Sequence, residues 1–119
     1  MSAMSINWFE IPVTDLDRAA TFYGAVFQQT LASMEGPGSM RVFMNGEVPF
    51  GAVSISAENA ASSTGVRIFL DAQGDLDGML ARVEKAGGTV ALPKTSIGQY
   101  GFIAHIVDLD GNTVGLHSV

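Results

Sequence analysis

The chain has 119 residues, 47% hydrophobic and 15% charged, which is enough for one domain with a buried core. Six Lys and Arg against twelve Asp and Glu give a net charge of −6, which argues against nucleic acid as a partner. The absence of cysteine excludes disulfides, thiolate catalysis and Cys-ligated zinc. No apolar run reaches the ~20 residues of a membrane span and no signal-peptide pattern is present, so we expect a cytoplasmic protein without a membrane partner.

The first half of the chain begins with a predicted strand and a predicted amphipathic helix. Phe9, Ile11 and Val13 alternate with other residues, which predicts a strand over 8–13. Thr14 and the Asp15-Leu16-Asp17 run can cap a helix, and apolar residues at helical spacing continue to Phe27. Strands over 30–35, 40–45 and 50–56 follow, separated by Gly-Pro-Gly and Asn-Gly turns.

The second half repeats this order. Asp75-Leu76-Asp77 lies 60 positions after Asp15-Leu16-Asp17 and opens a second helical pattern, which Gly87-Gly88 ends. Strands are expected over 66–71 before this helix and over 89–92, 99–107 and 113–117 after it, with a turn at Pro93-Lys94. The chain is thus a single α+β domain of two βαβββ modules, 5–56 and 65–119, with an Ala/Ser/Asn-rich linker over 57–64.

The duplicated order, the run VTDLDRAATFY and the ending DLDGNTVGLH resemble the vicinal oxygen chelate superfamily. That superfamily includes glyoxalase I, bleomycin-resistance proteins and extradiol dioxygenases, and the chain is similar to its small lactoylglutathione-lyase-related proteins. The resemblance implies that the two modules form a cup-shaped mixed sheet with helices on the outer face. It also implies a homodimer and, in enzymatic members, a divalent metal held by His and Glu in the cup.

The metal-ligand positions of the superfamily carry unsuitable residues here. The resemblance places them at Trp8, Arg67 and Gly115, with a fourth near 54–56. Indole, guanidinium and glycine do not ligate divalent metals, and 54–56 offers no carboxylate or imidazole. We therefore expect neither the usual metal nor another cofactor.

Strand alternation selects the side chains that should face the cup. They are Trp8, Glu10, Arg67, Phe69, Gly115 and His117. Their neighbours Phe9, Ile11, Val66 and Ile68 should pack under the helices. Glu10 and Arg67 could form a structural ion pair across the two modules, because a buried carboxylate needs a partner. Alternatively, Glu10 is a general base while Arg67 holds a substrate oxygen.

Four further residues have two interpretations each. His117 could stabilise a developing oxyanion or be a partly exposed edge residue, and His105 in FIAHIV could line the pocket or be a hydrogen-bonded structural histidine. Together with Glu10, these histidines could form a two-His-one-carboxylate iron site. Tyr100 and Trp8 could stack on a planar ligand or belong to the core.

Three functional hypotheses follow. The first is a homodimer of the bleomycin-resistance kind that binds a small organic molecule in the cup without metal. The second is a metal-dependent lyase, isomerase or dioxygenase with a rearranged site. The third is a metal-free enzyme in which Glu10 takes a proton and Arg67 or His117 stabilises the oxyanion. The sequence leaves the choice between binder and enzyme open, and a cup filled by side chains would fit none of the three.

Overall fold

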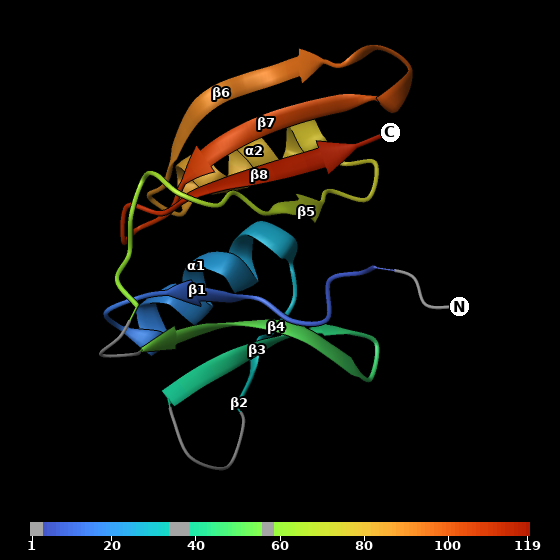
Figure 1. Ribbon diagram of the computed structural model, residues 1–119. Coiled ribbons are helices and arrows are strands. Elements are labelled where there is room, and N and C mark those ends of the chain that lie inside the picture. Colours follow the sequence, from blue (N-terminus) through green and yellow to red (C-terminus); the bar gives the residue numbers. More distant parts are fainter. Residues whose placement is uncertain (1–3, 34–38, 56–58) are drawn as a thin grey trace.

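Each half of the chain forms its own four-stranded mixed sheet with one helix (Figure 1). The structure is a computed structural model and describes residues 4–33, 39–55 and 59–119. The first module contains β1 (Glu10–Pro12), α1 (Leu16–Phe27), β2 (Ala32–Ser33), β3 (Ser39–Asn45) and β4 (Val48–Ile55). The second contains β5 (Phe69–Asp71), α2 (Leu76–Lys85), β6 (Thr89–Ser96), a 3-10 turn (Gly98–Tyr100), β7 (Phe102–Val107) and β8 (Thr113–Ser118).

The two sheets have the same topology. Their strand orders are β1-β4-β3-β2 and β5-β8-β7-β6, and in each the first strand pairs in parallel while the others pair antiparallel. This confirms the predicted α+β class and the duplicated βαβββ order. Within the part of the chain that the structure describes, no helix is long and apolar enough to cross a membrane.

Figure 1 shows α1 between β5 of the second sheet and β1 of the first, with α2 behind β7 and β8. Helix α1 packs on β3 and β4, helix α2 packs on β6, β7 and β8, and the two helices contact each other. One continuous hydrophobic core therefore spans both modules, with Phe22, Tyr23 and Val83 almost fully buried in it. Within one chain the eight strands form two separate four-stranded sheets, each with one face packed on its helix and one helix-free face.

Several predicted boundaries differ from the structure. The expected strand over 66–71 forms only as β5, and Val66, expected under a helix, is 96% exposed because it precedes the strand. The predicted turn at Pro93-Lys94 lies inside β6, where proline is tolerated because β6 is an edge strand. Gln99 belongs to the 3-10 turn instead of a strand. The predicted strand residues 34, 35 and 56, the predicted Gly-Pro-Gly turn over 36–38 and part of the linker lie outside the described residues.

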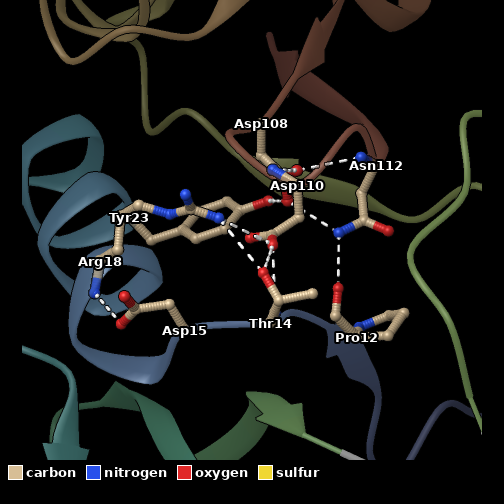
Figure 2. Close-up of polar contacts among 8 residues, drawn as sticks. All are labelled: Pro12, Thr14, Asp15, Arg18, Tyr23, Asp108, Asp110 and Asn112. Carbon is tan, nitrogen blue, oxygen red and sulfur yellow. Dashed lines mark hydrogen bonds and ion pairs between the residues drawn. The ribbon is translucent and has the colours of Figure 1, made fainter.

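A polar cluster fixes the two modules to one another (Figure 2). The Tyr23 hydroxyl donates to Asp108 Oδ2 at 2.7 Å, and the Asn112 side-chain amide donates to the Pro12 carbonyl at 2.8 Å. Asp110 Oδ1 accepts from the Thr14 hydroxyl at 2.7 Å and from the Thr14 N–H at 3.0 Å. The same oxygen also accepts from Arg18 at 3.1 Å.

These bonds satisfy polar groups that folding removes from water. Asp108 and Asn112 are buried, and two backbone N–H groups of the turn donate to Asp108 Oδ1 at 2.9 Å. A buried carboxylate with this many donors is stable in its charged form. The DLDGN run therefore serves as an inter-module clasp, which joins the end of β1 and helix α1 to the turn between β7 and β8.

Candidate functional site

The hydrogen-bond register shows which residues of the two modules occupy equivalent positions. Ala52 N donates to the Phe9 carbonyl in the first sheet, and Gly115 N donates to the Ile68 carbonyl in the second. Glu10 pairs with Ala52 as Phe69 pairs with Gly115, and Pro12 pairs with Ser54 as Asp71 pairs with His117. Trp8 is therefore the counterpart of Arg67, Glu10 of Phe69, Ala52 of Gly115, and Ser54 of His117.

The helix-free face of the first sheet carries Trp8, Glu10, Ala52 and Ser54, and we name it the Glu10 face. Glu10 is exposed, contrary to its expected position inside the protein, but its carboxylate is held at both oxygens. Oε1 accepts from the Ser54 hydroxyl at 3.1 Å, and Oε2 accepts from the Trp8 indole N–H at 3.2 Å. The two bonds orient the carboxylate above the sheet, with the indole ring beside it.

The helix-free face of the second sheet carries Arg67, Phe69, His105, Gly115 and His117, and we name it the Arg67 face. Arg67 Nη1 lies 3.5 Å from His105 Nε2, a long contact in which only Arg67 can donate. The His105 proton of the neutral ring is then on Nδ1. Desolvation, and second the charge of Arg67, lower the pKa of His105, so its ring is neutral at neutral pH.

Phe69 covers the centre of the Arg67 face. Its ring makes an edge contact with His105, with ring centroids 5.7 Å apart, and it is 46% exposed. It also lies over Gly115, where an added Cβ would overlap the ring. The ring of Phe69 thus requires glycine at position 115, because any side chain there would displace that ring.

His117 and Tyr100 meet at the end of the Arg67 face. His117 Nε2 lies 2.7 Å from the Tyr100 carbonyl oxygen, which can only accept, so Nε2 carries a proton. That nitrogen is then unable to bind a metal or take a proton. The Tyr100 side chain is 65% exposed and so does not belong to the core.

The structure therefore brings the candidate residues together in two groups. Trp8 and Glu10 share one face, while Arg67, Phe69, His105 and Gly115 share the other, with His117 near them. Within the described residues of one chain, Glu10 forms no ion pair with Arg67, and no cluster of three or more His, Asp or Glu could hold a metal. Glu10 lies on the first sheet and both histidines lie on the second, so the two groups stand on different sheets of one chain.

Comparison with known proteins identifies the family. The family model of the glyoxalase/bleomycin resistance protein/dioxygenase superfamily matches residues 5–116. This chain belongs to that superfamily. No curated protein matches the sequence significantly.

Solved structures of this superfamily share the fold. A glyoxalase/bleomycin resistance protein from Albidiferax ferrireducens T118 is 17% identical, with a TM-score of 0.78 over 95% of this chain and 97% of that chain. A superfamily enzyme from Burkholderia phytofirmans PsJN is 15% identical, with a TM-score of 0.72 over 98% and 99%. A mutant of the fosfomycin resistance protein FosX from Listeria monocytogenes, complexed with Mn(II) and 1S,2S-dihydroxypropylphosphonic acid, is 18% identical. Its TM-score is 0.70 over 99% of this chain and 92% of that chain.

The superfamily's metal does not fit the residues at its usual positions. The resemblance places these positions at Trp8, Arg67 and Gly115, and the register makes Ala52, not a residue of 54–56, the counterpart of Gly115. None of the four side chains can donate an electron pair to a divalent metal. A carboxylate at position 115 would also displace the ring of Phe69.

The sequence interpretation missed two partners. These are Ser54, which holds Glu10, and Ala52. Aligning FGAVSI (50–55) with TVGLHS (113–118) would have found both, since each segment is the last strand of its module and follows a glycine-containing turn. The part that Asp108 and Asn112 play in the clasp had no signal in strand or helix periodicity.

Proposed function

We propose that the protein binds a small organic molecule, without a divalent metal, in a cup that two copies of the chain complete. The observation that carries this proposal is the Arg67 face. An aromatic ring lies over glycine where the superfamily has a metal-binding carboxylate, and a guanidinium stands where it has a histidine. Phe69 supplies apolar contact area, and Arg67 can hold a carbonyl, carboxylate or phosphonate oxygen of the ligand.

The two-copy cup is supported by the groups that the two faces carry. A half-exposed phenyl ring and a guanidinium without an ion pair among the described residues stand on one face. An oriented carboxylate beside an indole ring stands on the other. The faces complement one another in charge and apolar surface, so the Glu10 face of one copy can close over the Arg67 face of another. The pairing of Glu10 with Arg67 would then form between copies.

The dimer is tested by light scattering after size exclusion, with 12.5 kDa as the mass of one chain. We expect twice this mass, and we expect Glu10→Lys and Arg67→Glu each to shift the protein toward monomer. Combining both substitutions in one chain should restore the dimer, because opposite charges face each other again. Glu84→Lys, on the exposed face of α2, is the control. A monomeric parent protein, or a double variant no better than the single ones, contradicts the arrangement.

Ligand binding is tested on protein purified without a histidine tag and checked by elemental analysis. Calorimetry with small carboxylates, phosphonates and dicarbonyl compounds should give binding without added metal, weakened about tenfold by Arg67→Met, since one charge-assisted bond is worth on the order of 1.4 kcal/mol or more. Phosphonates are included because of the FosX complex. One equivalent of tightly held Zn, Ni, Mn or Fe per chain would overturn the metal-free proposal and favour a lyase or dioxygenase.

A metal-free acid–base enzyme is the second candidate, and the geometry of Glu10 favours it. A carboxylate that two neighbours orient is suited to take a proton from a bound carbonyl compound, while Arg67 of the facing copy would stabilise the resulting oxyanion. Turnover of the same compounds, followed as solvent deuterium exchange at carbon by NMR, separates this enzyme from a binder. Exchange that Glu10→Gln abolishes would establish it.

A further inference from the structure

A cavity of about 220 Å³ lies where the two modules meet. It is bounded by the C-terminal end of α1, the β3–β4 hairpin and the end of β5, so both modules contribute to it. None of the residues that define the Glu10 face or the Arg67 face lines it. The cavity is therefore a separate feature of the single chain and does not depend on a second copy.

Aromatic rings form its apolar part. Phe43 is buried on the floor, with Leu31 and Leu70 beside it. The Phe27 and Phe50 rings stand as walls, with centroids 6.4 and 6.0 Å from that of Phe43. Phe50 remains 37% exposed, so a ligand in the cavity would remove apolar surface from water.

Polar groups surround this apolar floor. The side-chain amides of Gln29, Asn45 and Gln73 and the carboxylate of Asp71 are in the lining, whereas none of the described lining residues is basic. A carboxylate without a nearby cation repels an anionic ligand and favours a neutral or cationic one. The amides supply donors and acceptors for one hydrogen-bonding group.

The turn at Asp71–Gly74, which contributes Gln73 to the edge (the rim) of the cavity, is held in one conformation without a ligand. Glu10 and Phe69 are equivalent and 59 positions apart, but the helix caps Asp15 and Asp75 are 60 apart, so the second module has one extra residue before α2. The turn accommodates it with positive φ angles at Gln73 (53°) and Gly74 (78°), and Gln73 N–H donates to Asp71 Oδ1 at 2.7 Å. A non-glycine residue in this conformation is held there by its surroundings, which reduces the cost of ordering the rim around a ligand.

We propose that this cavity binds one small aromatic molecule: a single six-membered ring with a short neutral or cationic hydrogen-bonding group, such as a benzamide or a benzylamine. The size supports this class. An apolar cavity of about 150 Å³ accepts benzene, and pockets for drug-sized ligands begin at about 300 Å³. The present volume lies between them and suits one ring with one substituent. The ring would pack between Phe27 and Phe50, and its polar group would reach the amides.

The test is an NMR titration of the ¹⁵N-labelled protein with benzamide, benzylamine, benzoate and cyclohexanecarboxamide. We expect the first two to shift the amide signals of Asn45, Gly46 and Gln73. Benzoate should shift them at least tenfold less at equal concentration because of Asp71, and the saturated ring should bind more weakly than benzamide because it is not flat. Shifts confined to Phe69, His105 and Gly115, equal binding of benzoate, or no shifts at all would overturn the proposal.

Two variants and a control locate the site. Phe50→Ala should weaken benzamide binding at least tenfold, whereas Phe102→Ala, which truncates a ring of the same 37% exposure in β7 outside the cavity, should leave it unchanged. Thr30→Trp, at an exposed lining position, should fill the cavity and abolish the shifts without lowering the melting temperature. Benzamide binding that survives in a folded Thr30→Trp protein would place the ligand elsewhere.

Discussion

The hydroxyl of Tyr23 in α1 donates a 2.7 Å hydrogen bond to the buried carboxylate of Asp108, 85 positions later in the other module. Burial first, and Asp108 second, raise the pKa of Tyr23 well above its ordinary value. The bond therefore joins a neutral phenol to an anion inside the core, a pairing stronger than one between two neutral groups.

Tyr23→Phe should lower the free energy of unfolding by about 1.5–3 kcal/mol, the usual worth of a hydrogen bond to a charged group. The ring packing on Phe22 and Phe43 is kept, so the loss reports the hydroxyl alone. Urea denaturation measures this loss of stability, with Tyr100→Phe as the exposed control.

The pH dependence of the free energy of unfolding provides a second readout. Because the unfolded chain loses the Tyr23 proton first, stability is fully present below the ordinary tyrosine pKa of about 10 and falls above it. Tyr23→Phe should remove this alkaline loss, and an unchanged slope would count against the bond.

Asp110→Ala should destabilise the protein more than Arg18→Met does. The Asp110 side chain is 2% exposed and accepts three hydrogen bonds from the other module, whereas Arg18 is 48% exposed. Loss of the half-exposed arginine should cost under about 1 kcal/mol, and loss of the carboxylate about 2–3 kcal/mol, because the Thr14 donors are left without their acceptor. Hydrogen exchange should show faster opening of α1 in the Asp110 variant. Equal costs would mean that the ion pair, not the Thr14 bonds, holds the modules.

Gly115→Ala should destabilise the protein by about 1–3 kcal/mol, because the new methyl group overlaps the ring of Phe69. Phe69→Ala should largely relieve this cost, so the double variant is more stable than the sum of the two single changes predicts. Thermal unfolding of the four proteins completes this cycle. Additive effects would show that Gly115 is needed for its backbone and not for the ring above it.

His105 should titrate below the ordinary histidine pKa, and Arg67→Gln should move its midpoint upward. Desolvation of His105 remains in the variant, so its pKa should rise only part of the way toward the ordinary histidine value. The ¹³C–¹H signal of the His105 ring, followed by NMR from pH 4 to 9, measures both midpoints. Arg41→Gln, which removes a guanidinium from the other sheet, should leave the midpoint in place. A midpoint indifferent to Arg67 would exclude their electrostatic contact.

Glu10→Gln should change ligand binding or turnover more than His117→Ala. Glu10 presents an oriented carboxylate on its face, whereas Nε2 of His117 is committed to the Tyr100 carbonyl. Calorimetry on both variants, beside circular dichroism as a folding check, measures the difference. If the two proteins bind alike, the Glu10 face does not take part in the cup.

The sequence predicted the elements that follow a simple period, and for physical reasons it did not predict how the two modules meet. Alternation correctly placed Glu10, Phe69 and His117 opposite the core, because a strand has only two faces. How the two faces are set relative to one another depends on the packing of α1 on α2 and on the buried clasp. Contacts across 85 or more positions leave no local pattern in a single sequence. Val66 was misplaced because an apolar residue just outside a strand has the same sequence signature as one inside it.

The division of Glu10 and Arg67 between two faces has a genetic consequence. In the proposed dimer each complete site takes Glu10 from one copy and Arg67 from the other, so no chain contains a whole site by itself. Mixing a Glu10 variant with an Arg67 variant would then give hybrid dimers with one intact site and one site lacking both groups. Two inactive parents would regain up to half of the binding sites in these hybrids, a complementation between alleles that a protein with its whole site in one chain cannot show.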